Sequence, residues 1–343
     1  MSTEPITAQL NSLRRTRRAR QVGTLLLILG IVVVTYLGLG FVQFDIGEIQ
    51  SGVPAFIEFI FAFFPPNFES LTLYTKNNAI TGLSAIGASL ATPGTFVETL
   101  ASPRLTLVKA AVVTLLLGFL GTVLGFLPAL VLGVLGSEQV TPFPFNFIFR
   151  GTMSAIRAIP AIVWIFLFIP FGPPSQATAV LAIATDTIGN LGRLFTDELE
   201  EVEEGPIEAI QSTGASRTQT VGFGMLSQVS RSFIAWTLYI LEINTRIAIS
   251  LGVVGAGGLG LYIRNQQDLL QFQNTAAGIV MVFIVVLSIE LLSSRIRARL
   301  RPGEHESKGF VEGLRDLLNA EKWIGRTEKN RSHPAASGRS RRR

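Results

Sequence analysis

The 343-residue chain contains no cysteine and only two histidines, His305 and His333, both near its C-terminal end. The absence of cysteine excludes disulfide bonds, thiolate nucleophiles and cysteine-ligated metal sites. Charged residues are also scarce, at 15% of the chain, against about a quarter in an ordinary soluble domain. We therefore expect no metal site and no cofactor, and the low charge argues against a soluble protein.

The sequence is rich in long, uninterrupted runs of apolar residues. Hydrophobic residues make up 48% of the chain, and its mean hydropathy is +0.45. A run of about 17 to 25 apolar residues is long enough to cross the bilayer core as a helix. The sequence therefore predicts an all-α fold, a polytopic membrane helix bundle of about six transmembrane helices in a lipid bilayer.

Six apolar segments are expected to cross the membrane, at residues 22–42, 106–135, about 154–172, 177–195, 233–254 and 275–292. The cleanest stretch of the third segment, residues 158–172, contains Pro160 and would be only about 22 Å long as a helix, so the segment must begin earlier, near Ser154, or be partly buried in the bundle. The apolar stretch that closes with Pro65 and Pro66 is too short to span, so we expect an interfacial or re-entrant helix there. Gly121 and Gly125 have the small-xxx-small spacing that permits close helix packing.

The net charge of +5 does not indicate a nucleic-acid partner. Lys and Arg cluster at the ends of the apolar segments and in the tails, where they act as topology signals. Their distribution predicts that both termini face the cytoplasm. The expected organisation is a cytoplasmic basic N-terminus (1–21), a first transmembrane helix (22–42), an extracytoplasmic connection (43–104), a membrane core (105–296) with a cytoplasmic loop at 196–230, and a largely disordered basic tail (297–343).

The cytoplasmic loop contains a polar stretch, "EAIQSTGASRTQTVGFG", which is rich in residues that cap helices. Residues 206–213 can form two helical turns, and Gly214 can take the left-handed conformation that ends a helix. Ser216 and Gln219 have the spacing of a capping box for a second helix. Because a two-turn helix is marginal in water by itself, we expect a groove on a partner protein to hold it.

These residues resemble a known family. "EAIQSTGAS" looks like the Glu-Ala-Ala loop of the inner-membrane subunits of ABC importers, with Ile210 where a second alanine is usual. Ser227 stands where that pattern usually has proline. The blocks "RAIPAIVWIFLFI", "GRLFTDELEEVEEGPIEAIQSTGAS", "FGMLSQV" and "LEINTRIAISLGVVGAGGLG" are similar, in the same order, to the permease of phosphonate importers. The similarity covers roughly residues 106–294.

The resemblance implies a type I ABC importer permease-like fold, with 105–296 as the permease core and both ends in the cytoplasm of a cell-membrane protein. It implies four kinds of partner: a cytoplasmic ATP-binding subunit, an extracytoplasmic substrate-binding protein, a second copy of the permease and the lipid bilayer. ATP hydrolysis would belong to the separate subunit, so this chain is not expected to be an enzyme. The residues expected to contact the ATPase are Ile207, Glu208, Ala209, Ile210, Gly214, Ala215 and Ser216.

A glycine-rich stretch, "GAGGLG" at 255–260, satisfies the dinucleotide fingerprint G-x-G-x-x-G letter for letter. That motif needs a strand before it and an acidic residue about 20 positions later, and residues 275–285 contain no acid. The sequence also lacks G-x-x-x-x-G-K-[ST]. We therefore predict a non-helical break where backbones pack closely, made by Gly255, Gly257, Gly258 and Gly260.

Ionisable groups inside membrane spans are expensive and usually functional. The candidates for the translocation path are Asp186, Asn190, Glu242, Asn244 and Arg246. Glu242 and Arg246 are four residues apart in the favourable order for a helical ion pair, so they form either a structural pair or a site where Arg246 helps an anion pass. An acid would repel an anion, so Asp186 is expected to pair with a basic neighbour or to face away from the path.

The leading hypothesis is the permease subunit of an ATP-driven importer for phosphonate or a related phosphorus oxyanion. Within the transporter class, the alternative is a permease for methionine or a quaternary amine. A membrane-embedded enzyme is disfavoured, since the spans lack a histidine, cysteine or acidic cluster for catalysis. An ion channel would not explain the capped cytoplasmic loop.

Overall fold

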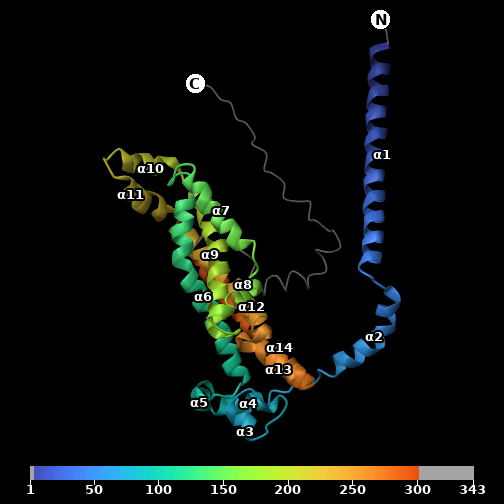
Figure 1. Ribbon diagram of the computed structural model, residues 1–343, viewed down its shortest axis with the longest axis vertical. Helices are drawn as coiled ribbons and strands as arrows, with labels where there is room; N and C mark the ends of the chain where they lie inside the picture. Colours follow the sequence, from blue (N-terminus) through green and yellow to red (C-terminus); the bar gives the residue numbers. More distant parts are fainter. Residues whose placement is uncertain (1–3, 301–343) are drawn as a thin grey trace, which may run out of the picture. The chain divides into compact units, whose positions relative to one another are not determined.

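A computed structural model describes residues 4–300, and every regular element in that range is helical (Figure 1). The chain divides into two compact units, Met1–Phe64 and Pro65–Arg343. The first unit contains α1 (Glu4–Phe41) and α2 (Ile46–Phe61). The second contains α3 (Leu73–Asn77), α4 (Ser84–Ala91), α5 (Thr95–Ala101), α6 (Leu107–Gly136), α7 (Phe145–Arg157), α8 (Ala161–Leu167), η1 (Ile169–Phe171), α9 (Gln176–Glu200), α10 (Glu204–Gln211), α11 (Arg217–Gln219), η2 (Thr220–Met225), α12 (Leu226–Leu251), η3 (Gly252–Ala256), α13 (Gly258–Asp268) and α14 (Phe272–Leu300).

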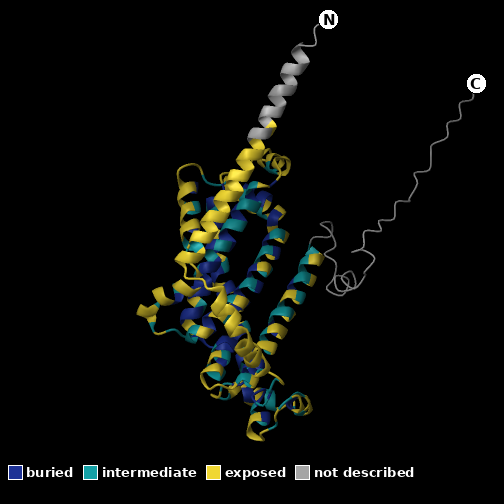
Figure 2. Ribbon diagram, turned by 90° about the vertical axis from the view of Figure 1, so that its right-hand side faces the viewer, coloured by how far each residue is buried: buried dark blue, intermediate teal, exposed yellow. Residues whose placement is uncertain are grey.

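The first unit is one long helix followed by a shorter one. α1 begins well before the predicted first span, so the basic stretch and the apolar stretch form a single helix, whose span covers Arg20–Phe41. α2 is capped by Asp45, whose carboxylate accepts from the Gly47 amide at 2.7 Å. At 16 residues α2 is short, as expected for the segment that ends before the two prolines. From Val22 to the end of α2 the large apolar side chains are exposed, as the yellow ribbon in Figure 2 shows.

Close packing of α6 against α9 forms the centre of the second unit. A Cβ atom on Gly125 would lie 2.6 Å from the Ala184 carbonyl oxygen, and one on Gly121 would lie 2.3 Å from Ile183. The predicted small-residue packing is confirmed, and it extends to Gly133 further along α6. Around this pair, α7, α8 and α12 cover the remaining sides of α9.

The third predicted span is not one straight helix. α7 and α8 meet at an angle of 91°, and the break between them contains Pro160, which has no amide hydrogen to continue the helix. The Trp164 indole donates to the Ile156 carbonyl at 3.4 Å across the corner. The helical segment does begin before the cleanest apolar stretch, at Phe145, but it is a bent pair of helices and not one straight span.

Within residues 4–300, four helical segments are long and apolar enough to cross a membrane, or five if the bent pair counts as one span. These are Arg20–Phe41, Leu107–Gly136, Arg217–Ala256, Phe272–Leu300 and the pair α7–α8. α9, the fourth predicted span, is not among them, but it has 25 residues, enough for about 37 Å of helix. Its lower apolarity follows from its central place, since Leu181 alone is exposed between Thr178 and Glu200.

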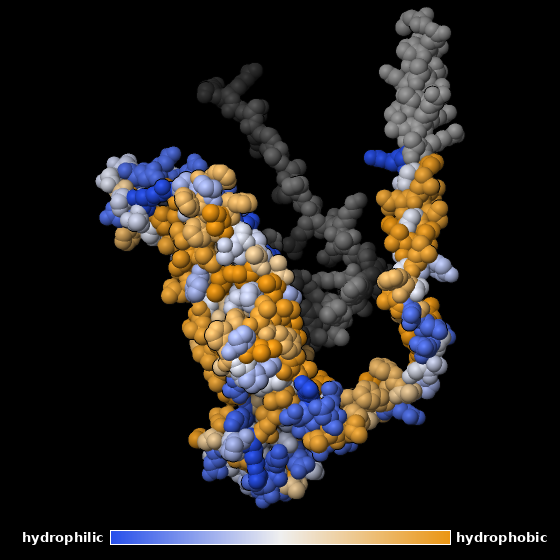
Figure 3. All heavy atoms as spheres, in the orientation of Figure 1, coloured by the Kyte–Doolittle hydropathy of each residue, from blue (hydrophilic) through white to orange (hydrophobic). Residues whose placement is uncertain are grey.

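The two ends of the second unit are polar, and its middle is apolar (Figure 3). At one end, α3, α4 and α5 form a small cap. A hydrogen bond from the Leu107 amide at the start of α6 to the Ser70 carbonyl, 2.8 Å long, joins the segment before α3 to the bundle. At the opposite end, α10 and α11 project from the bundle (Figure 1). α9 continues to Glu200 and α12 starts at Leu226, so the predicted 196–230 loop is shorter. Residues 297–300 belong to α14, and the rest of the predicted tail lies outside the described residues.

Candidate functional site

The polar stretch between α9 and α12 folds as a short helix, α10, held on one side and exposed on the other. Ile207 is half-buried and packs with Val221 against the core that contains Phe195 and Phe233. Glu208 and Ala209 are exposed. The predicted helix over 206–213 is thus found two residues earlier, at 204–211. Glu208 and Ala209 lie on its outward face, whereas Ile207 and Ile210, also predicted to contact the ATPase, are half-buried against the bundle.

The turn after α10 has the predicted backbone. Gly214 has φ +81°, and nothing lies within 4 Å of where its Cβ would be, so conformation and not space requires glycine. The capping box is also confirmed, since the Ser216 amide donates to the Gln219 side chain at 2.8 Å. Ser227 bonds the Phe223 carbonyl within a continuing helix, so no turn occurs where the family pattern has proline.

A cavity of about 420 Å³ lies between α10, η2 and the connection from α6 to α7. Ile207, Ala215 and Arg217 are among its lining residues. The Arg217 guanidinium donates to the Val140 carbonyl at 2.7 Å, which ties α11 to that connection. Gly224 leaves room for Ile210, whose side chain would lie 3.2 Å from an added Cβ. α10 is therefore joined to the bundle by a few contacts around a hollow rather than by a packed interface.

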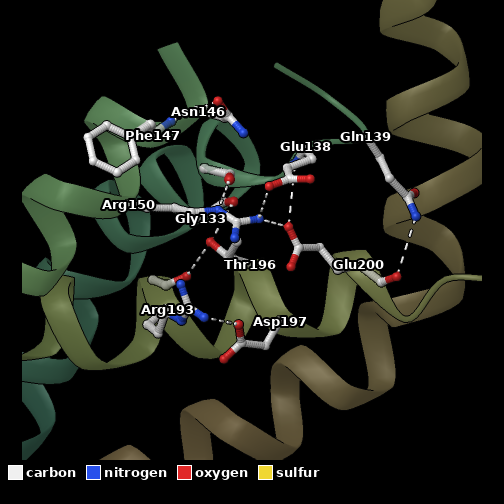
Figure 4. A network of polar contacts seen from close by, with 12 residues as sticks. Gly133, Glu138, Gln139, Asn146, Phe147, Arg150, Arg193, Thr196, Asp197 and Glu200 are labelled. Atoms are coloured by element: carbon white, nitrogen blue, oxygen red, sulfur yellow. Dashed lines mark hydrogen bonds and ion pairs between the residues drawn. The ribbon is translucent and has the colours of Figure 1, made fainter. Parts of the chain in front are cut away.

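A polar cluster joins the ends of α6, α7 and α9 next to this loop (Figure 4). At its centre Arg150, on α7, donates to the Gly136 carbonyl at 2.7 Å and forms an ion pair with Glu200. Glu138 lies 3.8 Å from the same guanidinium. The Gln139 amide reaches the Glu200 carbonyl at 3.4 Å. We refer to Glu138, Arg150 and Glu200 as the Arg150 cluster, which fastens three helices where the loop begins.

Glu242 and Arg246 form the predicted ion pair on α12, 2.5 Å apart. Two further contacts were not foreseen: Arg246 lies 3.6 Å from Glu290, and Arg297 lies 3.6 Å from Glu242. Both new partners are on α14. The pair therefore joins α12 to α14, which favours the structural alternative, while a role for Arg246 in the path stays a prediction.

Asn244 is fully buried where α6, α9 and α12 meet. Its amide group donates to the hydroxyls of Thr122 and Thr187, at 2.8 Å each. Inside a membrane bundle such hydrogen bonds between helices hold the packing in register. These contacts give Asn244 a structural task, distinct from the path role predicted for it.

Asp186 and Asn190 lie together on another face of the bundle. The Asn190 amide donates to the Asp186 carboxylate at 3.0 Å, and both line a cavity of about 330 Å³. Arg157, Trp236 and Tyr239 line the same cavity, whereas Glu242 and Arg246 do not. The structure thus splits the predicted polar set into separate places. The basic residue that shares this cavity with Asp186 is Arg157, which the sequence had shown only as a topology signal.

The glycine-rich stretch is a break between two helices. Gly255, Gly257 and Gly258 have φ of +107°, +99° and +67°. A Cβ on Gly260 would lie 2.0 Å from the Ile249 carbonyl oxygen, and the Leu259 amide donates to Thr114 of α6 at 2.9 Å. The predicted non-helical break with closely packed backbones is confirmed. A helix precedes it, so the strand that a dinucleotide fingerprint requires is not there.

Comparison with known proteins identifies the family. Residues 121–304 match the binding-protein-dependent transport system inner membrane component. The chain is 27% identical over 285 residues to HtxC of Stutzerimonas stutzeri, assigned as a phosphite transport system permease protein, covering 82% of this chain and 87% of that one. It is 37% identical over 118 residues to PhnE2 of Escherichia coli (strain K12), assigned to a cryptic phosphonate transport system, covering 34% of this chain and 97% of that one.

Among solved structures, the inward-facing MetNI methionine ABC transporter has a chain that matches with a TM-score of 0.51 at 23% identity. The match covers 57% of this chain and 96% of that chain, and it shows a shared fold. Several apolar helices of membrane length, the type I importer fold and a family match over more than half of the chain agree. The chain belongs to the binding-protein-dependent transport system inner membrane component family, the membrane permeases of ABC importers that pair with an ATPase and a substrate-binding protein.

Proposed function

We propose that this permease forms the translocation path for phosphonate or a related phosphorus oxyanion. Relatives assigned to phosphite and phosphonate transport, one of them similar over most of both chains, support this substrate class. The methionine transporter shares the fold at 23% identity, which carries no argument about substrate. Two copies of the chain would form the pore, an extracytoplasmic binding protein would deliver the ligand, and two ATPase subunits would bind on the cytoplasmic side.

The single observation that carries the coupling role is the exposed outer face of α10. Glu208 and Ala209 face outward, whereas Ile207 holds the helix to the bundle. An eight-residue helix has little stability of its own, so a groove on the ATPase would both hold it and move it. Closure of the ATPases around ATP would displace α10 and, through its few contacts, the ends of α9 and α12. The pore would then switch from inward-facing to outward-facing.

The test is substrate-stimulated ATP hydrolysis by the purified complex of permease, ATPase and binding protein. Phosphonates, phosphite and phosphate are compared with methionine and with a quaternary amine. We expect stimulation by at least one phosphorus oxyanion and none by the two other ligands. Uptake of the stimulating ligand should also require the permease gene. Stimulation by methionine alone would contradict the proposal and support the alternative substrate.

A further inference from the structure

The cavity lined by Arg157, Asp186 and Asn190 has the features of a ligand site, an inference that rests on the proposed transport function. Three helices contribute to it: Arg157 ends α7, Asp186 and Asn190 lie on α9, and Trp236 and Tyr239 lie on α12. Its volume of about 330 Å³ falls in the range of small-molecule pockets, roughly 300–1,000 Å³. The Trp236 ring is fixed by a hydrogen bond to Glu198 at 2.6 Å.

The depth of this cavity makes its charges informative. Asp186 is near the middle of α9, about 15 Å of helix from the end at Gln176. Ionisable side chains at such depth are costly and mark substrate paths. The non-helical segment between α7 and α8, which follows Arg157, lies beside the same cavity. Irregular backbone at membrane depth is tolerated where it is buried in protein or lines a water-filled space.

Arg157 is the cation that is available to a ligand. Among the residues that the structure describes, no hydrogen bond and no ion pair within 4 Å involves its guanidinium, and the charge that acts on it across the cavity is that of Asp186. Arg246, by contrast, is held by Glu242 and Glu290. A guanidinium is planar and offers paired donors that match the oxygens of a phosphorus oxyanion. Arg157 is therefore better placed than Arg246, one of the predicted path residues, to attract an anion.

Asp186 places a carboxylate beside that cation, where it would repel an anion. An ionised carboxylate only accepts hydrogen bonds, so a ligand must offer it a hydrogen. Phosphite, phosphonates and phosphate carry a P–OH group in their monoanionic form, together with ionised oxygens. Sulfate has a similar size and charge but has no O–H near neutral pH. A buried polar group left without its partner strongly disfavours the analogue that lacks the hydrogen bond.

We propose that this cavity binds a phosphorus oxyanion that bears at least one P–OH group. Arg157 takes the ionised oxygens, and Asp186, oriented by the amide of Asn190, accepts the hydrogen of the P–OH. Asp186 is then the residue that discriminates against sulfate within the membrane, after the binding protein has released its ligand. The Asp186 carboxylate repels any anion, but a hydrogen bond from P–OH offsets the repulsion, so anions without a hydrogen to donate bind more weakly.

The test measures binding to the purified permease–ATPase complex without the binding protein, so that only the permease selects. Thermal unfolding is followed in a mildly acidic buffer, in which phosphite keeps its O–H, with increasing sodium phosphite or sodium sulfate. We expect wild type to bind phosphite about 10- to 100-fold more tightly than sulfate, the range of one hydrogen bond to a charged group. Asp186→Asn should reduce this ratio to about threefold or less.

Three further variants separate the site from the fold. Asp186→Glu keeps an acceptor and should retain the preference for phosphite. Arg157→Gln should weaken both ligands. Arg193→Gln is the matched control, because Arg193 pairs with Asp197 on α9 and does not line the cavity, so both affinities should stay as in wild type.

The inference is overturned if wild type is stabilised equally by the two anions or by neither, or if Asp186→Asn keeps the full preference. If the Asp186 variants fail to assemble, the wild-type comparison still decides. Uptake by cells separates this inference from the proposed function. If wild-type cells take up phosphite but the purified complex does not prefer phosphite to sulfate, the proposed function stands and the proposed site is wrong. Cells that take up no phosphorus oxyanion contradict the proposed function itself.

Discussion

Gly214 sets the direction in which the chain leaves α10. Its φ of +81° lies in the left-handed region, where a β-branched residue is a strong outlier. The position is otherwise open, since no atom lies within 4 Å of an added Cβ. A substitution there therefore acts through the backbone and not through a steric clash. The short helix before it has few contacts to resist the change.

Gly214→Val should weaken binding of the ATPase and abolish most uptake, while the protein still reaches the membrane in normal amounts. Holding valine at this φ costs about 1–3 kcal/mol, and α10 would fray or turn rather than accept the strain. Co-purification of the ATPase and uptake by the same cells measure the effect. Gly222→Val is the control, because Gly222 is equally open but has no left-handed φ. Full ATPase recovery and full uptake for Gly214→Val would reduce the stretch to a connector.

Arg246→Ala should lower uptake relative to the amount of protein in the membrane, because buried Glu242 loses the nearer of its two basic partners in the described part of the chain and keeps Arg297. If the pair serves mainly to join α12 to α14, also replacing Glu242 by Gln should restore part of the uptake. We expect this partial recovery from the contacts with Glu290 and Arg297. A double variant as impaired as Arg246→Ala would instead support a role for Arg246 in the path.

At the scale of elements, the Arg150 cluster fastens the ends of α6, α7 and α9 beside the loop that carries α10. Arg150→Ala removes the donor to Gly136 and the partner of Glu200 at once. Losing such a charge-assisted contact costs about 1–3 kcal/mol. We expect the ATPase still to bind and hydrolyse ATP, with uptake per ATP reduced, because α10 would move without carrying the three helix ends along.

The matched control for this prediction is Arg193→Ala. Arg193 pairs with Asp197 at 3.0 Å on the surface of the same helix, and such pairs contribute about 0.3–0.5 kcal/mol. Uptake per ATP should stay near the wild-type value. An Arg150→Ala protein with normal uptake, or one that fails to bind the ATPase at all, would contradict the role of the Arg150 cluster in transmission.

Local backbone features could be predicted from the sequence. Gly214, the Ser216–Gln219 capping box and the glycine break at 255–260 are each specified by residues close together in the chain. The Gly121–Gly125 contact surface also has a local signature. Local prediction failed where a helix could either continue or break. Pro160 bends the third span by 91°.

The cavity beside Asp186 could not be predicted, because its lining comes from three helices. Arg157 served as a topology signal in the sequence, and nothing near it in the chain specifies that Asp186 lies close by. Trp236 and Tyr239 look like ordinary membrane-interface aromatics until α12 is placed against α9. The sequence left open whether Arg246 serves the path or a structural pair, because Glu290, its partner on α14, lies more than forty residues away. Long-range packing decided which charge is neutralised.

At the scale of the whole molecule, the distribution of Lys and Arg predicts both termini in the cytoplasm. Cysteines introduced singly into this cysteine-free chain can test that. With an impermeant reagent on intact cells, Ser51→Cys and Ala177→Cys should be labelled, and Ser2→Cys and Ser337→Cys should not. Ala177 is exposed in the first turn of α9, at the end predicted to face outward. It is a better labelling site than Ser175, whose side chain caps α9. Labelling at either terminus would refute the topology.

The enclosure of α9 has a consequence for how the protein is made. Segments enter the membrane during synthesis according to their apolarity, and α9 is less apolar than the four helices that qualify as spans alone. It must therefore enter the bilayer by pairing with α6, already inserted, whose glycine surface receives it. Filling that surface with Gly125→Leu should then leave a fraction of chains with α9 outside the membrane and α12 inverted. The groove in α6 would act as a template for insertion before it acts as a packing surface.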